Sequence, residues 1–178
     1  MRYAALLRGI NVGGNKKIAM AQLRELLDDL GHADVATILQ SGNAVFTSPS
    51  QDPQALGAAI AGGIEDRFRM SVSVVIRTGE QLATALRSSP LPGEPENPSR
   101  FFVAFLSAAP AEAAIEAIGA QSFDPDKIWV SGQEAYLWCP AGAAETVLTN
   151  AFIEKRLGVT ATSRNWNTVT KLVGLTGG

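Results

Sequence analysis

The apolar positions of the first 78 residues predict six elements in the order strand, helix, strand, strand, helix, strand. Apolar runs bounded by turn residues predict strands at 2–7, 35–39, 44–47 and 72–76. Helical spacing of apolar residues predicts one helix from Met20 to Gly31 and a second after Asp52-Pro53. This order is that of a split βαβ, or ferredoxin-like, unit.

A second unit of the same order is predicted after a segment with four prolines at 90–98, which fix an extended linker. A helix at 80–87 precedes this linker. The pattern beyond it predicts strands at 101–106, 128–130, 135–139 and 159–162, and helices at 111–118, 143–157 and 165–175. The expected fold class is therefore α+β, with two tandem ferredoxin-like halves and a short C-terminal helix. We expect the domains to be 1–78, a helix and linker at 79–99, and 100–178.

Composition places the chain among ordinary globular proteins, with 178 residues, 46% hydrophobic, 18% charged and a net charge of −2. No apolar run reaches the roughly 18 residues of a membrane span, and the first apolar stretch is too short for a signal peptide. The single cysteine, Cys139, excludes an internal disulfide and agrees with a reducing compartment. We expect a cytoplasmic protein with no membrane partner.

The charges are distributed unevenly along the chain. Residues 1–24 carry five basic side chains and no acid, and residues 155–178 carry four basic side chains and no acid, so the remainder has a net charge of −11. If the two ends meet in the fold, they form a positive patch that attracts anions. The alternative is that these side chains are solvated separately.

A polar glycine loop follows the first predicted strand. Gly9 and Gly14 frame four residues, but Asn15-Lys16-Lys17 follows where a P-loop needs Lys and then Ser or Thr, so an NTPase is not supported. Glycines nevertheless let successive backbone N–H groups face one point, beside lysines and close to a helix N-terminus. The loop therefore favours an anion site; otherwise it only connects a strand to a helix.

Two further polar segments are candidates. Gln40-Ser41-Gly42-Asn43 is typical of a hairpin turn, and Ser41 lacks the flanking glycines of a nucleophile elbow. The stretch 162–168 surrounds a tryptophan with polar residues, among which Arg164 is a planar donor suited to an anion. Asn165 can simply cap the last helix, and Trp166 can simply lie in the core.

Metal and standard RNA-binding signatures are weak. With His32 and Cys139 as the only residues of their types, no zinc site can form, and we expect neither a metal nor a cofactor. RNA-recognition domains share the ferredoxin-like order and stack bases on strand aromatics. The first half lacks that signature; in the second half the pairs Phe101 with Phe105 and Tyr136 with Trp138 share strand faces, an arrangement for which buried packing is the favoured explanation.

Three segments together resemble a bacterial family called domain of unknown function 1697. The resemblance covers nearly the whole chain and implies an α+β protein of two ferredoxin-like halves, without an established activity or catalytic residues. Ala19 departs from the expected proline, which loosens the helix start. The positions that match the family signature are Arg8, Asn11, Gly13, Gly14, Gln40, Ser41, Gly42, Asn43, Arg164, Asn165, Trp166, Asn167 and Lys171.

We predict that the three segments meet in one positive site for a phosphate-bearing or other anionic ligand, either a small molecule such as a nucleotide or a nucleic acid. Arg8, Lys16 and Arg164 would supply charge, and Gly13 and Gly14 backbone donors. The other side chains would orient or stack on the ligand: Asn11, Gln40, Ser41, Asn43, Asn165, Trp166, Asn167 and Lys171. The alternatives are a metal-independent enzyme using Ser41 or Lys16, and an interaction or scaffold protein whose polar motifs only build turns and caps.

Overall fold

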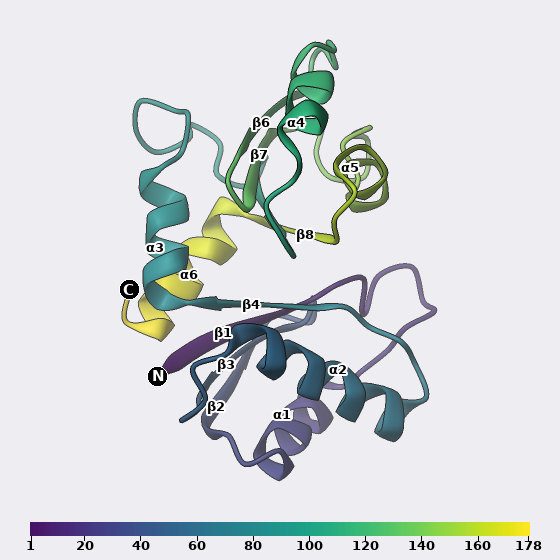
Figure 1. Ribbon diagram of the computed structural model, residues 1–178, viewed down its shortest axis with the longest axis vertical. Helices are drawn as coiled ribbons and strands as arrows, with labels where there is room; N and C mark the ends of the chain where they lie inside the picture. Colours follow the sequence, from purple (N-terminus) through teal and green to yellow (C-terminus); the bar gives the residue numbers. More distant parts are fainter. The chain divides into compact units, whose positions relative to one another are not determined.

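The computed structural model describes residues 1–178, and the chain divides into two compact units. The first unit comprises Met1–Ala83 and Leu172–Gly178, and the second unit comprises Thr84–Lys171. Each unit holds one four-stranded antiparallel sheet with two helices against one face (Figure 1). The α+β fold with two ferredoxin-like halves is therefore confirmed. The division into 1–78, 79–99 and 100–178 remains a proposal.

The first unit has the predicted order of elements. Its sheet has the strand order β2-β3-β1-β4. The elements are β1 (Arg2–Leu7), α1 (Met20–Asp29), β2 (Ala33–Ile38), β3 (Asn43–Thr47), α2 (Pro53–Phe68) and β4 (Val74–Thr78), followed by the start of α3 (Gly79–Arg87). Because β1 is antiparallel to β3 on one side and to β4 on the other, the segments that follow β1 and precede β3 and β4 lie at the same end of the strands.

The two helices of the first unit begin differently. Asp52 caps α2, because its carboxylate accepts hydrogen bonds from the amides of Gln54 at 2.9 Å and Ala55 at 3.2 Å. Ala19 precedes α1 and provides no side-chain cap. Both helices bury apolar side chains against the same sheet face, where Phe46 packs at 5.9 Å from Tyr3, centroid to centroid. Burial of this face, rather than capping, therefore holds α1 in place.

The second unit repeats this arrangement with the strand order β6-β7-β5-β8. Leu106, Leu137 and Ile153 are among the buried residues that join its sheet to its two helices. The elements are β5 (Phe101–Leu106), α4 (Glu112–Gly119), β6 (Lys127–Ser131), β7 (Glu134–Trp138), α5 (Asn150–Leu157) and β8 (Ala161–Asn165), with α6 (Trp166–Thr176) beginning in this unit. No helix of the chain has both the length and the hydropathy that crossing a membrane requires.

Two predicted boundaries in the second half were wrong. The helix predicted from residue 143 begins at Asn150, where the Thr149 hydroxyl accepts from the amide of Phe152 at 3.2 Å. The alanines before it favour a helix by propensity alone, which the capping threonine overrides. The last strand also extends to Asn165, because its pairing with β5 continues to the register pair Phe102 and Asn165. Arg164 therefore lies in a strand.

Candidate functional site

Asn11 closes the base of the loop between β1 and α1. Its backbone has a φ of 56°, and its amide donates to the Lys16 carbonyl at 2.6 Å. Its side-chain oxygen accepts from the Ile18 amide at 3.0 Å, while its side-chain nitrogen donates to the Ile18 carbonyl at 2.9 Å. A left-handed asparagine that bonds its own neighbourhood in this way fixes a tight loop. Residues 12–15 are therefore held out as an exposed tip.

The tip consists of two consecutive left-handed glycines and their neighbours. Gly13 has a φ of 66° and Gly14 a φ of 89°, and no atom lies within 4 Å of the position that a Cβ would take at either residue. The amides of both glycines donate no hydrogen bond within the chain. Two exposed donors on adjacent residues are the kind of backbone group that binds anions.

The basic side chains of this segment have different surroundings. The Lys16 ammonium donates to the Ser71 carbonyl at 2.6 Å, and the Arg8 amide donates to the Ser73 carbonyl at 2.9 Å, so both residues fasten the loop to the chain before β4. Lys17 is exposed and contacts no acid. Sequence reasoning chose Lys16 and missed Lys17 as a ligand candidate, although the two are adjacent and equally basic.

The Gln40–Asn43 turn meets the base of the loop. The Asn11 side chain donates to the Gln40 carbonyl at 2.6 Å, and the Leu7 amide donates to the Gly42 carbonyl at 2.9 Å. Asn43 is fully buried, and its side-chain nitrogen donates to the Ile38 carbonyl and to the Ser41 hydroxyl, each at 3.0 Å. The structure therefore brings the first two predicted segments together, with Asn11 and Asn43 shaping the backbone of the loop and the turn.

The third predicted segment belongs to the second unit. Arg164 is 8% exposed and donates to the Thr162 hydroxyl and to the Ser163 carbonyl, each at 2.8 Å. Burial lowers the pKa of Arg164 to about 10, which leaves the guanidinium charged at neutral pH. Arg164 is therefore a buried residue of β8 and does not lie on an open surface.

The neighbours of Arg164 start the last helix. The Asn165 side chain caps α6 by accepting from the Thr168 amide at 3.0 Å, and Trp166 is 7% exposed and packs edge-on against Phe101 at 5.7 Å. Asn167 and Lys171 expose their side chains. That this segment shares a ligand with the loop of the first unit stays a prediction.

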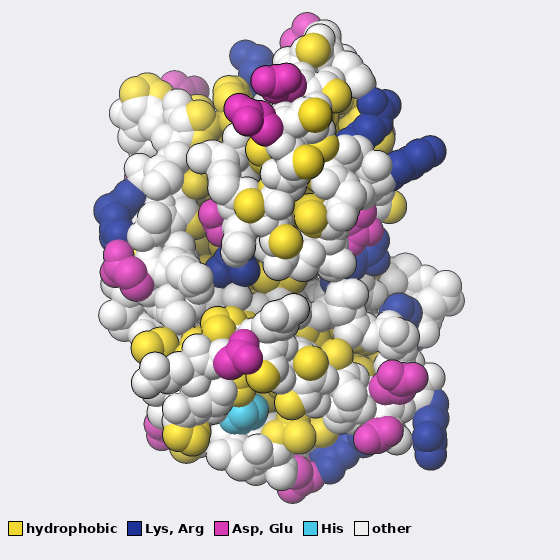
Figure 2. Space-filling model, in the orientation of Figure 1, with side chains coloured by type: hydrophobic (Ala, Val, Ile, Leu, Met, Phe, Trp, Pro, Cys, Tyr) yellow, Lys and Arg dark blue, Asp and Glu magenta, His cyan; other side chains and the backbone are white.

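The charged side chains that Figure 2 shows are interspersed, with basic and acidic groups close to one another rather than gathered by sign. No three His, Cys, Asp or Glu side chains are grouped so that they could hold a metal ion. On this face of the molecule, no broad field of one sign is present.

His32, the only histidine, is half-buried and has one ring nitrogen without a hydrogen-bond partner. Its Nε2 atom is buried and makes no hydrogen bond, and its ring lies 4.5 Å from that of Phe46, centroid to centroid. Burial lowers the pKa of His32 below its usual value of 6.5. At a pH between the lowered pKa of folded His32 and the usual value of 6.5, the histidine is therefore protonated in the unfolded chain and neutral in the folded chain.

We expect the free energy of unfolding to fall as the pH drops below about 6.5, because protonation then favours the unfolded chain. The stability that neutral His32 provides is fully present above that pH. Urea denaturation at about pH 7.5 and about pH 5.5 measures the difference. His32→Phe keeps the ring contact and should flatten this dependence; an unchanged dependence in the variant would assign it to carboxylates.

Comparison with known proteins decides the family. A family model described as "Protein of unknown function (DUF1697)" matches residues 1–136. The chain belongs to the DUF1697 family. The matched region contains the whole glycine loop and the Gln40–Asn43 turn, while the segment around Arg164 lies beyond it. The resemblance predicted from the sequence is confirmed.

The fold of this chain is also found in a solved structure. The structure of conserved bacterial protein SP0830 from Streptococcus pneumoniae is similar, with a TM-score of 0.77 and 22% identity over 99% of this chain and 98% of that chain. At this identity the likeness shows only that the two chains have the same fold along almost their whole lengths. A search of the curated proteins gave no match.

Proposed function

We propose that this DUF1697 protein binds a phosphate-bearing or other anionic ligand at the glycine loop of its first unit. The observation that carries this proposal is the pair of exposed amides of Gly13 and Gly14, which have no hydrogen-bond partner in the chain. Successive N–H groups of a turn such as this one form a concavity in which an anionic oxygen can accept both. Lys17 adds an exposed positive charge to the same segment.

The surroundings of the loop support an anion rather than a cation. Residues 1–24, which include the first turn of α1, contain no acid. The amides at the start of α1 have no side-chain cap, so the positive end of the helix dipole is not neutralised by the chain. Each of these features stabilises a negative group near the end of the loop.

The base of the loop supports specificity. An anion-binding loop needs its amides held in place before the ligand arrives, because ordering a flexible loop on binding reduces affinity. Asn11, with bonds to Ile18 and Gln40, provides this order. In this proposal Asn11, Ser41 and Asn43 position the loop and turn, while Gly13, Gly14 and Lys17 touch the ligand.

The wider site is also proposed. Arg8, Lys16 and Gln40 would border the ligand within the first unit. A nucleotide and a nucleic acid both offer the phosphate that the loop needs. Binding across many oligonucleotide sequences with a steep salt dependence would identify a nucleic acid backbone.

Calorimetric titration with inorganic pyrophosphate tests the loop directly. Gly14→Ala should weaken binding at least about tenfold, because a Cβ disfavours the left-handed backbone that aims the amide and hydrogen bonds to charged groups contribute about 1.5–3 kcal/mol. Lys17→Gln should weaken binding less, by about threefold, because an exposed charge is screened. AMP and a single-stranded oligonucleotide, titrated in parallel, identify which phosphate source binds more tightly.

Gly132→Ala is the matched control. Gly132 also has a positive φ, of 60°, and open space around its Cβ position, but it lies in the β6–β7 turn of the second unit. It should bind pyrophosphate like the original chain. Equal affinity of the Gly14 and Gly132 variants would contradict the proposed site, and an effect of Lys171→Gln would add the third segment to it.

A further inference from the structure

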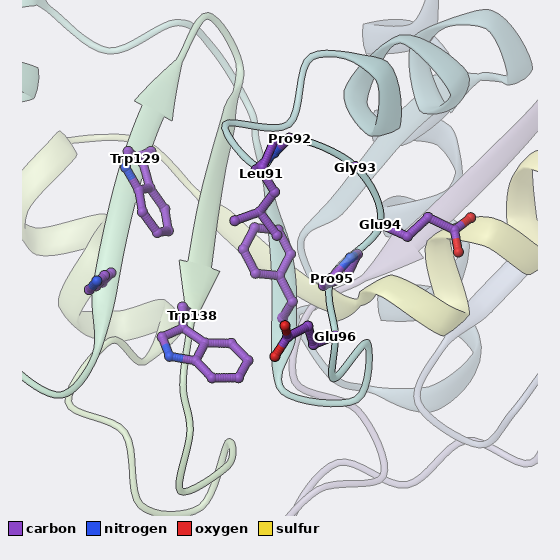
Figure 3. Close-up of a pocket in the computed structure, with 10 residues that line it drawn as sticks. Leu91, Pro92, Gly93, Glu94, Pro95, Glu96, Trp129 and Trp138 are labelled. Carbon is purple, nitrogen blue, oxygen red and sulfur yellow. The ribbon is translucent and has the colours of Figure 1, made fainter.

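The second unit contains a pocket of about 470 Å³ that none of the sequence motifs indicated. Its floor is Phe101, with Trp129 of β6 and Trp138 of β7 beside it, and the segment 91–96 forms the opposite wall. Figure 3 shows both indoles on the same side of the two strands, with Leu91 and Pro95 facing them. A concave site of this size and apolar lining is suited to a small organic ligand.

The strand register explains why the tryptophans share this pocket. Trp129 lies opposite Tyr136, and Lys127 lies opposite Trp138, so the two tryptophans are diagonal neighbours on one sheet face. Diagonal residues of antiparallel strands are about 7–8 Å apart. At this spacing both indoles are within reach of one small ligand.

The floor of the pocket is rigid. Phe101 is fully buried, and its ring centroid lies 6.3 Å from that of Trp129 and 5.7 Å from that of Trp166. Tyr136, next to it on the sheet, is 2% exposed and donates its hydroxyl to the Ala85 carbonyl at 2.7 Å. Burial, with a smaller effect of Glu134, raises the pKa of Tyr136 to about 12, so this hydroxyl keeps its proton and its bond.

Packing therefore accounts for Phe101, Phe105 and Tyr136, three of the four aromatics that the sequence analysis weighed for base stacking. The fourth, Trp138, is half-buried, and so is Trp129, which that analysis did not consider. A ligand that stacks on this unit would do so across β6 and the end of β7.

Polar groups at the rim have no partners in the chain. The carboxylate of Glu96, the ammonium of Lys127 and the indole N–H groups of Trp129 and Trp138 make no hydrogen bond or ion pair. Figure 3 shows Glu96 turned toward Trp138 and Glu94 turned away from the pocket. The pocket thus offers acceptors and donors at the edge of an aromatic surface.

We propose that this pocket binds a planar nitrogen heterocycle of the nucleobase type, stacked on Trp129 and Trp138. Glu96 accepts hydrogen bonds from the ring N–H or amino groups, and Lys127 and the indole N–H groups donate to its carbonyl or ring-nitrogen acceptors. This site is independent of the anion loop proposed above, because it needs no phosphate and uses residues of the second unit alone.

The test is a titration of 2-aminopurine riboside, a fluorescent nucleoside without phosphate, with the purified full chain. We expect saturable quenching of the nucleoside as it stacks. Trp138→Leu and Trp129→Leu should each weaken binding about tenfold, the usual contribution of one aromatic platform to base stacking. Glu96→Gln should weaken it by a similar factor, because the carboxylate is the stronger acceptor.

Glu116→Gln is the matched control, since it makes the same change at an exposed side chain of α4 that does not line the pocket. This variant should bind like the original chain, and thermal unfolding should show that the Glu96 and Glu116 variants are equally folded. Quenching that does not saturate, or that is equal in all four variants, overturns the proposal. Saturable binding of choline without binding of the nucleoside also overturns it, in favour of an organic cation.

Two sources could supply the base, and a second arm separates them. A single-stranded oligonucleotide containing one 2-aminopurine is titrated beside the riboside. Either outcome counts only if Trp138→Leu weakens binding of both probes. Binding at least about tenfold tighter than the riboside, with a steep salt dependence, identifies a nucleic acid strand. Equal affinity identifies a free nucleoside or nucleotide. Because the riboside carries no phosphate, failure here leaves the pyrophosphate result at the glycine loop unchanged.

Discussion

Gly42→Ala should destabilise the protein by about 3 kcal/mol or more, the largest effect that we expect from a single methyl group. Gly42 has a φ of 82°, which a residue with a Cβ adopts at a cost of about 1–2 kcal/mol. Its Cβ would also come within 2.8 Å of Ile10 Cγ1 and 2.9 Å of Leu7 Cβ. Both neighbours are fully buried, so neither can move away without disturbing the core.

Urea denaturation of Gly42→Ala beside Gly31→Ala separates these two causes. Gly31 has a φ of 83° but nothing within 4 Å of its Cβ position, so it reports backbone strain alone. We expect about 1 kcal/mol for Gly31→Ala. Similar losses in the two variants would show that the contact of Gly42 with Ile10 and Leu7 is looser than the structure indicates.

Asn11→Ala should lower the free energy of unfolding by about 2–3 kcal/mol, because it removes three side-chain hydrogen bonds and places alanine in a left-handed backbone. It should also abolish pyrophosphate binding, because the loop then loses the bonds that order it. The Ile18 amide and the carbonyls of Ile18 and Gln40 would then lack their partner. Denaturation measures the stability, and pyrophosphate titration measures the function. Retained pyrophosphate affinity would show that the amides of the tip need no support from Asn11.

Two further variants divide the effect of Asn11. Asn11→Gly loses the side chain but relieves the backbone, so it should be more stable than Asn11→Ala by about 1 kcal/mol. Asn11→Asp keeps the acceptor for the Ile18 amide but places a carboxylate against two carbonyl oxygens. We expect it to be destabilised by more than Asn11→Gly at neutral pH, and to recover in acid as the carboxylate is protonated.

Periodicity predicted the fold well because burial decides it. The strand at 2–7 and the helix from Met20 were found from apolar spacing alone, and their buried residues occupy one continuous core. The start of the helix at Asn150 was missed because the residues before it have the composition of a helix, while the Thr149 cap sets the boundary. The first and last residues of an element depend on single capping residues and single strand pairs, and composition does not identify these.

The candidate site was predicted unevenly for a related reason. The meeting of the glycine loop with the Gln40–Asn43 turn follows from strand pairing: β1 is antiparallel to β3, so the end of β1 lies beside the start of β3. Which atoms are free is a different question. Asn43 and Arg164 have the chemistry of ligand contacts, yet their burial depends on tertiary packing that no local pattern reports.

The sequence contained a sign of the tryptophan pocket that its hydrophobic periodicity alone did not reveal. Lys127, Trp129 and Trp138 alternate onto one face, which the register Lys127 with Trp138 makes evident. Locating the pocket also required knowing that the prolines of 90–98 fold back along this face, whereas the sequence pattern indicated only an extended linker. Proline fixes local backbone direction but not the surface against which it lies.

The first unit is built from both ends of the sequence, which has a consequence for synthesis. Arg2 Nε donates to the Leu175 carbonyl at 2.6 Å, and the Cβ position of Gly79 lies 2.9 Å from the Thr176 carbonyl. On the ribosome, residues 1–83 emerge long before residues 172–178, so this half waits without its closing segment while the intervening half is translated. The half synthesised first is thus the half completed last.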